Sequence, residues 1–311
     1  MNRLLTVLWI TLLSVSLQSR AQQKITLDDI FTKGTFRAQS VHGLRSMNDG
    51  LHYTTIEGYN KIVKYSYQSG NEVAVLLDLG KVDNAPITSF SDYAFSDDEK
   101  KILLRTDVRP IYRHSFTAEY YVWNSVTGEL SALSDKGPQQ LATFSPDGNR
   151  IAYVRHNNIY IKNLNFGSTS QATFDGKENE IINGAPDWVY EEEFGFNKAF
   201  WWSPDSKFLA YLQFDEREVP EFSMPLYTGQ SPEYEQYRSY PGKKSFKYPK
   251  AGEKNSVVKV MSYEIKSKMN IPVQVGQETD QYIPRLKWSP SNELVIMRLN
   301  RLQNQLDLLY A

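Results

Sequence analysis

The chain has 311 residues, of which 41% are hydrophobic and 23% charged, with 36 acidic and 35 basic side chains. This balance is that of a globular protein long enough for one large domain or two modest ones. A formal charge of −1 without a basic block argues against a nucleic-acid-binding surface. The absence of cysteine excludes disulfide bonds and lipidation at a cysteine.

The first residues are typical of an export signal. Arg3 precedes an uncharged apolar run from Leu4 to Leu17, and Ser19-Arg20-Ala21 fits a small-x-small cleavage site. The run is too short for a comfortable membrane span. We therefore predict that residues 1–21 are a signal peptide, that Gln22 becomes the N-terminus, and that the protein reaches the periplasm or the cell surface. An uncleaved signal anchor is the alternative.

A turn motif recurs along the rest of the chain. Its clear copies are Phe144-Ser145-Pro146-Asp147-Gly148, Trp202-Ser203-Pro204-Asp205-Ser206 and Trp288-Ser289-Pro290-Ser291-Asn292, with fainter copies at Phe95–Asp98 and Arg45–Gly50. Pro at the second position and Gly or a small polar residue at the fourth suit a type I turn after the serine. Apolar strand-like segments follow each copy at a period near 50 residues. The pattern predicts an all-β fold, a partial β-propeller of about five four-stranded blades. A β-sandwich with chance turn resemblance is the alternative.

The copies are unequally spaced, because their serines are 50, 49, 58 and 86 residues apart. Extra residues must leave the blades as loops or small appendages. The excess in the third interval coincides with residues 184–197, and the fourth interval contains a predicted exposed excursion, Tyr227–Lys254. A longer loop is also predicted between Thr106 and Ala118, and it carries Arg113.

The insertion at 184–197 contains Asp187-Trp188-Val189-Tyr190-Glu191-Glu192-Glu193-Phe194. An aspartate after a proline can cap a helix, and acidic residues in the first turn favour the helix dipole, so we predict a short helix from about Trp188. In a helical turn, Glu192 and Glu193 can lean towards one bound group. A solvated acidic run is the competing interpretation.

Catalytic and cofactor motifs are not evident. The four histidines are scattered without metal-ligand spacing, and there is no phosphate-binding glycine loop, dinucleotide fingerprint or Gly-x-Ser-x-Gly elbow. We therefore predict no catalytic residue, no metal and no cofactor in this chain. What remains is a binding constellation of two carboxylates and an arginine.

Carboxylates accept hydrogen bonds and suit an ammonium group, whereas arginine donates and suits a carbonyl or carboxylate. Together, Glu192, Glu193 and Arg113 would hold the two polar ends of a short peptide backbone. The alternative is that Arg113 pairs with a neighbouring carboxylate and stiffens its own loop.

Several segments in order resemble the N-terminal half of the dipeptidyl peptidase IV family, the S9B branch of the prolyl oligopeptidase serine peptidases. The arginine segment is Tyr112–Ala118 and the double-glutamate motif lies within Asp187–Glu193; further matching segments are Trp201-Trp202-Ser203-Pro204, Glu218-Val219-Pro220 and Tyr248-Pro249-Lys250-Ala251-Gly252. The resemblance covers essentially the whole chain after the signal segment, from Ile25 onwards.

This resemblance implies an eight-bladed propeller joined to an α/β-hydrolase domain, in an enzyme that releases N-terminal dipeptides with Pro or Ala at the second position. It assigns the α-ammonium of the substrate to Glu192 and Glu193, and the peptide carbonyl region to Arg113. Residues 22–40, in particular Lys24 to about Thr35, would pack on the hydrolase domain, and residues 41–311 would form the partial propeller. A homodimer is left open.

The sequence departs from the family pattern in two ways. The spacing from Glu193 through Phe194-Gly195-Phe196 to Trp201 is one residue shorter, which affects the contacts expected just past the glutamate pair. The family's Ser, Asp and His also lie in a C-terminal domain that this chain does not contain. We therefore expect a fragment of a longer gene product that is inactive alone and has an open propeller edge. The rival hypothesis is a free-standing propeller module that binds peptides or a protein without catalysis.

Overall fold

The computed structural model describes residues 24–38, 40–227 and 241–311. The chain divides into two compact units, Met1–His42 and Gly43–Ala311. The predicted signal peptide, residues 1–21, lies outside the described residues. Within the described ranges, no helix is both long and apolar enough to cross a membrane.

The first unit contains one short helix, α2 (Leu27–Phe31). Thr26 begins it with a capping box: its hydroxyl accepts from the backbone nitrogen of Asp29 at 3.1 Å, and the Asp29 carboxylate accepts from the Thr26 backbone nitrogen at 3.0 Å. No residue of the helix is buried. Its apolar side chains, Leu27 and Phe31 among them, are therefore exposed to solvent.

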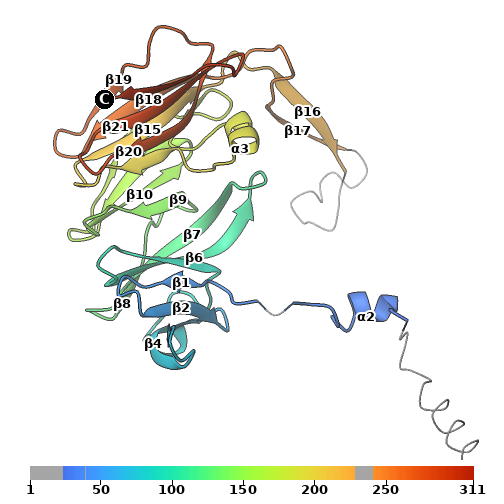
Figure 1. The fold of residues 1–311 in the computed structure, drawn as a ribbon, viewed down its shortest axis with the longest axis vertical. Helices are drawn as coiled ribbons and strands as arrows, with labels where there is room; N and C mark the ends of the chain where they lie inside the picture. Colours follow the sequence, from blue (N-terminus) through green and yellow to red (C-terminus); the bar gives the residue numbers. More distant parts are fainter. Residues whose placement is uncertain (1–23, 39, 228–240) are drawn as a thin grey trace, which may run out of the picture. The chain divides into compact units, whose positions relative to one another are not determined.

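The second unit is a succession of antiparallel sheets that follow one another along the chain (Figure 1). The first sheet consists of β1 (Arg45–Ser46), β2 (His52–Glu57), β3 (Lys61–Ser66) and β4 (Glu72–Asp78), and a 3-10 turn, η1 (Leu79–Lys81), follows it. The second consists of β5 (Asp92–Phe95), β6 (Lys101–Pro110), β7 (Phe116–Asn124) and β8 (Glu129–Ala132). The third consists of β9 (Gln140–Phe144), β10 (Arg150–Arg155), β11 (Asn158–Asn163) and β12 (Thr169–Gln171).

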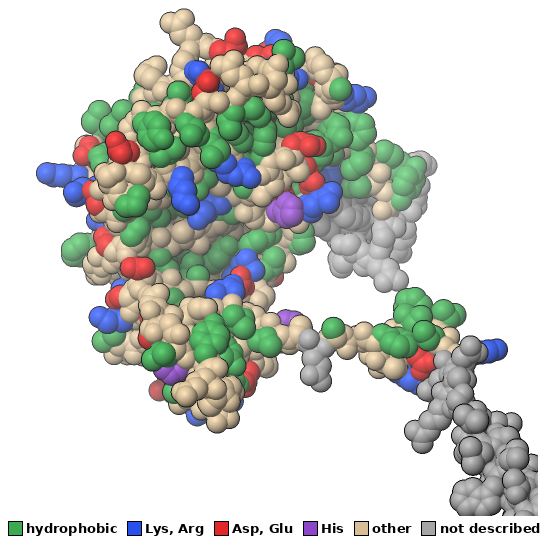
Figure 2. Space-filling view, viewed as in Figure 1, with side chains coloured by type: hydrophobic (Ala, Val, Ile, Leu, Met, Phe, Trp, Pro, Cys, Tyr) green, Lys and Arg blue, Asp and Glu red, His purple; other side chains and the backbone are tan. Residues whose placement is uncertain are grey.

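The fourth sheet has five strands: β13 (Ile181–Asn183), β14 (Phe200–Trp202), β15 (Phe208–Asp215), β18 (Val257–Glu264) and β19 (Met269–Val273). The fifth has three: β20 (Gln281–Trp288), β21 (Leu294–Asn300) and β22 (Leu306–Tyr310). These successive sheets confirm the predicted all-β, partial propeller fold. Acidic and basic side chains are interspersed over the face seen in Figure 2.

Hydrophobic packing joins each sheet to the next. Four buried clusters are formed, one for each pair of neighbouring sheets. Between the second and third sheets, for example, Leu103 and Tyr120 pack with Ile151 and Tyr153. Because both faces of an inner sheet are covered by neighbours, its middle strands are apolar runs such as Ile151–Val154.

The recurring turn motif has the same local structure in the clear copies. The Ser145 hydroxyl donates to Asp147 at 2.5 Å and accepts from the Arg150 backbone nitrogen at 3.0 Å; Ser203 does the same with Asp205 and Phe208. The fourth position, counted from the serine, has a left-handed backbone in four copies, with φ between 56° and 65° at Glu99, Gly148, Ser206 and Asn292. In the faintest copy the left-handed residue is Gly50, with φ 67°, at the fifth position counted from Ser46. Glycine and small polar residues tolerate this conformation best, which explains the motif's composition.

The aromatic residue before the turn also bonds to the preceding sheet. The indole nitrogen of Trp202 donates to the Thr143 carbonyl oxygen at 3.3 Å, and that of Trp288 donates to the Trp201 carbonyl oxygen at 3.0 Å. Each acceptor lies two residues before the serine of the preceding copy. The motif therefore positions neighbouring sheets as well as closing a turn.

The insertion predicted at 184–197 leaves and re-enters the fourth sheet at one point. β13 and β14 both pair with β15, one after the other, and the insertion lies between them. At its base, the Ala199 backbone nitrogen donates to the Gly184 carbonyl oxygen at 2.9 Å. Gly184 has φ 77°, and a Cβ there would lie 2.9 Å from the Ile159 side chain, so the closure requires glycine.

Two other excursions differ in detail from their predictions. The segment 106–118 is mostly strand rather than loop: β6 and β7 extend past a bulge at Asp107, which has φ 50°, and only residues 111–115 form the connecting turn. The predicted exposed excursion, Tyr227–Lys254, contains strand β17 (Gly242–Lys247), which pairs with β16 (Glu221–Leu226) just before the predicted start. Its residues 228–240 lie outside the described residues.

Candidate functional site

The acidic stretch forms the helix predicted for it, α3 (Trp188–Phe194). Asp187 caps its first turn, because its carboxylate accepts from the Tyr190 backbone nitrogen at 2.9 Å and from the Ser256 hydroxyl at 2.6 Å. Burial raises the pKa of Asp187, although both hydrogen bonds act in the opposite direction. The Tyr190 hydroxyl accepts from the Ile283 backbone nitrogen at 2.8 Å, which fixes the helix against the fifth sheet.

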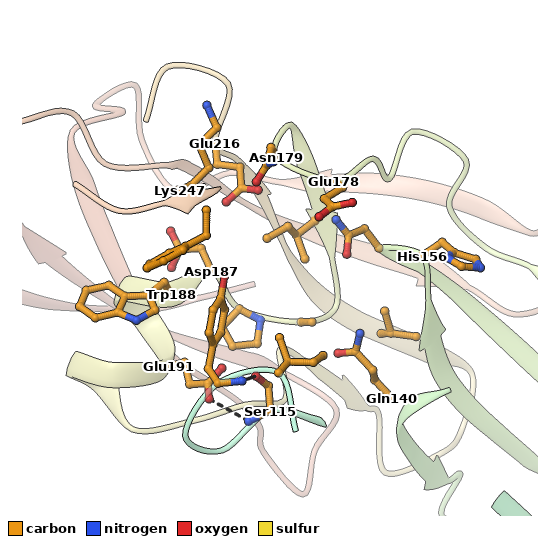
Figure 3. Close-up of a pocket in the computed structure, with 18 of the residues that line it drawn as sticks. Ser115, Gln140, His156, Glu178, Asn179, Asp187, Trp188, Glu191, Glu216 and Lys247 are labelled. Carbon is orange, nitrogen blue, oxygen red and sulfur yellow. Dashed lines mark hydrogen bonds between the residues drawn. The ribbon is translucent and has the colours of Figure 1, made fainter. Parts of the chain in front are cut away.

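Glu191 joins the helix to the β6–β7 hairpin. Its side chain is buried, with 1% of the residue exposed, and Oε1 accepts from the backbone nitrogens of His114 at 2.6 Å and Ser115 at 2.8 Å. Figure 3 shows the bond to Ser115 as a dashed line. Asn197, just after the helix, donates from its side-chain nitrogen to the His114 carbonyl oxygen at 2.7 Å. The hairpin tip is therefore held both by the middle of the helix and by the segment that follows it.

The three predicted site residues lie next to these bonds between helix α3 and the hairpin tip. The Arg113 Nε and a Glu192 carboxylate oxygen form an ion pair at 2.8 Å, with the Arg113 side chain 72% exposed and that of Glu192 14% exposed. Glu193 is exposed and forms no ion pair with the described residues. The structure thus brings Arg113 and Glu192 together, while Glu193 faces solvent from the next position of the helix.

The ion pair leaves donors and acceptors unused. It occupies one guanidinium nitrogen and one carboxylate oxygen, so within the described residues the terminal nitrogens of Arg113 and the other oxygen of Glu192 have no hydrogen-bonding partner. The pairing is the one expected if Arg113 stiffens its own loop. It also places the donor fork of Arg113 beside one of the two predicted carboxylates, that of Glu192.

Helix α3 ends abruptly at Gly195. Gly195 has φ 69° and ψ 36°, a left-handed backbone that terminates the helix directly after Phe194. Arg285 then donates to the Phe194 carbonyl oxygen at 2.8 Å and lies over the Phe196 ring. The cation at the helix C-terminus opposes the negative end of the helix dipole.

A cavity of about 640 Å³ lies beside helix α3 and the hairpin tip (Figure 3). Helix α3, the hairpin tip, the β10–β11 turn and strand β17 contribute to its lining, which includes Trp188, Glu191, Ser115, His156 and Lys247. Neither Glu192 nor Glu193 lines it. We call Arg113, Glu192 and Glu193 the clamp. Helix α3 therefore presents Trp188 and Glu191 to the cavity and its two clamp glutamates to a different side.

Glu216 is an unusual member of this cavity. Only 6% of the residue is exposed, and its carboxylate has no hydrogen-bonding partner or ion pair among the described residues. Its pKa is raised to about 7, chiefly by burial and then by the nearby charge of Asp187, whereas the charge of Lys247 acts in the opposite direction. Lys247 donates instead to the Val219 carbonyl oxygen at 2.8 Å.

Sequence reasoning missed the roles of Glu191, Asn197 and Arg285. Glu191 was detectable in principle: in a helix capped by Asp187, Tyr190, Glu191 and Phe194 share a face, and two of these are large and aromatic. That face is the buried one, which separates Glu191 from the two glutamates that follow. Nothing in the sequence pattern identifies the partners of Asn197 or Arg285, because each bond spans more than 80 residues.

The fold and the site define a β-propeller region with a charged helix and an arginine hairpin at the ends of two of its sheets. The chain belongs to the dipeptidyl peptidase IV family: residues 96–311 match the family described as "Dipeptidyl peptidase IV (DPP IV) N-terminal region". This confirms the resemblance seen in the sequence.

Individual relatives agree with this assignment. Human prolyl endopeptidase FAP is 33% identical over 297 residues, 92% of this chain and 37% of the relative. The rat protein named inactive dipeptidyl peptidase 10 is 31% identical over 97% of this chain and 37% of its own length. The crystal structure of Porphyromonas gingivalis dipeptidyl peptidase 4 superposes with a TM-score of 0.86 at 40% identity, covering 93% of this chain and 40% of that one. The chain thus spans well under half the length of these relatives.

Proposed function

We propose that this chain is the substrate-recognition portion of an exported dipeptidyl aminopeptidase, a serine exopeptidase that releases X-Pro or X-Ala dipeptides. In this proposal Glu192 and Glu193 bind the free α-ammonium of the peptide, and Arg113 binds its carbonyl region. The observation that carries it is the Arg113–Glu192 ion pair at 2.8 Å, in which both partners keep unused polar atoms. Names of relatives such as dipeptidyl peptidase 4 support the reaction class.

The clamp would measure substrate length. If the ammonium is held at one point, the peptide bond after the second residue of the substrate lies at a constant distance from it. A catalytic group at that distance would therefore release dipeptides. Each charge-assisted hydrogen bond to the ammonium contributes about 1.5 to 3 kcal/mol net, enough for two of them to select a free N-terminus. The proposed partner that supplies the catalytic group is a C-terminal α/β-hydrolase domain, and the exposed apolar side chains of Ile25, Leu27 and Phe31 offer a surface for it to cover.

The test uses the full-length protein and a Gly-Pro chromogenic substrate. Glu192→Gln or Glu193→Gln should lower kcat/KM, because the bound ammonium loses a charged partner. The corresponding loss of transition-state stabilisation is about 2 to 5 kcal/mol. The wild-type protein should prefer the free substrate to its N-acetylated form, and the variants should lose that preference. Glu129→Gln, an exposed glutamate on β8, is the matched control. Unchanged cleavage by both clamp variants would contradict the role.

Export is proposed together with this function. Residues 1–21 would be removed and the mature protein would begin at Gln22, in the periplasm or at the cell surface. The protein is recovered from membrane and periplasmic fractions of its native cells, and its intact mass is measured. A mass that includes residues 1–21 would favour the signal-anchor alternative.

A second candidate is a module that binds peptides without cleaving them. The rat relative is named inactive, and all three clamp residues lie within this region of the family. Calorimetric titration of residues 22–311 with a Gly-Pro peptide, together with cooperative thermal unfolding as a monomer, would support this candidate. Absence of a cooperative transition would favour the fragment of an enzyme.

A further inference from the structure

A second polar cavity, separate from the clamp, lies between the second and third sheets. It has a volume of about 250 Å³, and its lining comes from β5, β6, β7, β9 and the segment just before β14. Its charged members are Asp92, Arg105 and Lys198, and the hydroxyl-bearing residues Tyr120 and Thr143 also line it. None of these residues contributes to the large cavity beside α3.

Lys198 has no carboxylate partner in the described part of the chain. Its ammonium makes one long contact, 3.5 Å to the Thr143 hydroxyl, and lies 5.5 Å from the centre of the Phe200 ring. Burial lowers the pKa of Lys198, and no neighbouring charge opposes that shift. A cation taken out of water in this way destabilises the fold unless an anion compensates it.

Arg105 is also incompletely satisfied. One terminal nitrogen forms an ion pair with Asp92 at 2.9 Å, and the guanidinium lies 4.5 Å from the centre of the Phe116 ring. Its Nε is buried and has no hydrogen-bonding partner. Buried donors of this kind are rare in folded proteins and indicate a missing acceptor.

Asp92 cannot neutralise both cations. Its other carboxylate oxygen already pairs with Arg45 at 2.9 Å, so a single negative charge is shared by two arginines before Lys198 is counted. Among the residues that line the cavity, Arg105 and Lys198 are cations and Asp92 is the one carboxylate. The cavity therefore carries a local excess of one positive charge together with unused donors.

We propose that this cavity binds a small oxyanion, a phosphate or a carboxylate, between Lys198 and Arg105. The ammonium supplies a point charge and the guanidinium supplies a directed donor, which together are the usual partners of an oxyanion. The volume admits a group of a few heavy atoms, so a free inorganic anion or a single carboxylate-bearing group fits, and a nucleotide does not.

The site shares a chain segment with the clamp. Asn197 precedes Lys198 and also bonds the His114 carbonyl oxygen in the arginine hairpin. An anion that holds Lys198 in place would therefore also order the segment that supports the clamp. This link does not depend on the clamp binding a peptide, so the two proposals can fail separately.

The experiment compares thermal unfolding and calorimetric titration with inorganic phosphate and with succinate, in the wild-type protein, Lys198→Met and Lys207→Met. Lys207 is 73% exposed and serves as the control for nonspecific anion effects. Phosphate or succinate should bind the wild-type protein and Lys207→Met alike, and at least about tenfold more weakly to Lys198→Met. Without ligand, Lys198→Met should melt at or above the wild-type temperature, because an uncompensated buried charge is removed.

Binding of phosphate alone identifies an inorganic anion as the source, and binding of succinate alone identifies a carboxylate-bearing group. If Lys198→Met does not fold, Arg105→Lys is the second variant. It removes the unpartnered Nε donor, keeps the positive charge and should weaken binding in the same way. Equal stabilisation of the wild-type protein, Lys198→Met and Arg105→Lys by both anions overturns the proposal.

Discussion

The side-chain nitrogen of Asn197 donates to the carbonyl oxygen of His114 at 2.7 Å, across 83 residues of sequence. Together with Glu191, it makes the arginine hairpin and helix α3 a single unit, although they belong to different sheets. The position of Arg113 relative to Glu192 therefore depends on residues that carry no charge towards the proposed substrate.

Removal of this bond should loosen the hairpin tip without unfolding the protein. Asn197→Ala should cost about 0.5 to 1.5 kcal/mol and increase amide hydrogen exchange across residues 111–115. Exchange followed by mass spectrometry measures this. Asn165→Ala is the control, since the Asn165 side chain donates to Asn149 in a distant turn. Unaltered exchange at the tip would show that Glu191 alone holds it.

Two glutamates of α3, Glu191 and Glu193, should respond differently to truncation. Glu191→Ala leaves the half-buried N–H of His114 and the buried N–H of Ser115 without an acceptor and should lower the free energy of unfolding by about 2 to 3 kcal/mol, whereas Glu191→Gln should cost less because its amide oxygen can still accept. Glu193→Ala, at an exposed position, should change stability by no more than about 0.5 kcal/mol. Urea denaturation of the three variants tests the contrast, and equal losses at positions 191 and 193 would refute it.

Glu216 should make the protein less stable as the pH rises. Its pKa is raised from 4.5 to about 7, so between these values the folded state keeps a proton that the unfolded state releases, and stability falls by about 3 kcal/mol across that range. Below pH 4.5 both states are protonated and the effect vanishes. Glu216→Gln should match the wild-type protein at pH 4.5 and exceed its stability at pH 8.

Urea denaturation at several pH values provides the measurement. Glu221→Gln is the control, because Glu221 is exposed on the neighbouring strand β16. The raised pKa of Asp187 has the same sign of effect, so some pH dependence should persist in Glu216→Gln. Parallel stability curves for the wild-type protein and this variant would exclude a protonated Glu216.

The hydrogen bonds that indole nitrogens donate to the preceding sheet can be tested by comparing substitutions at three tryptophans. Trp202→Phe and Trp288→Phe each remove one hydrogen bond to the preceding sheet and should each cost about 0.5 to 1.5 kcal/mol beyond the change in packing. The Trp123 indole nitrogen is buried without a partner, so Trp123→Phe should be neutral or stabilising with respect to hydrogen bonding. Calorimetric unfolding separates these outcomes; equal losses at all three positions would assign the effect to packing.

Local chemistry made the turns and α3 predictable. The Ser-Pro-Asp copies specify their turns through bonds within five residues, and Asp187 caps its helix through the next three. The spacing of the copies then located the insertion between Gly184 and Ala199. These features depend on neighbours in sequence, so a sequence pattern carries them.

The remaining features depend on partners that are distant in sequence. The strand character of residues 106–110 follows from pairing across a bulge, and the bond of Trp288 to Trp201 spans 87 residues. The burial of Glu216 and of Lys198 follows from the packing of several sheets around them. Composition ranks both residue types as surface groups, which is why neither was singled out from the sequence.

The hydrogen bond between Ala199 and Gly184 has an evolutionary consequence. Because the inserted segment begins and ends at one point of the fourth sheet, its length and composition can change while β13, β14 and β15 keep their register. Natural variation can thus change the charged helix without changing the sheet that carries it, provided that glycine remains at position 184.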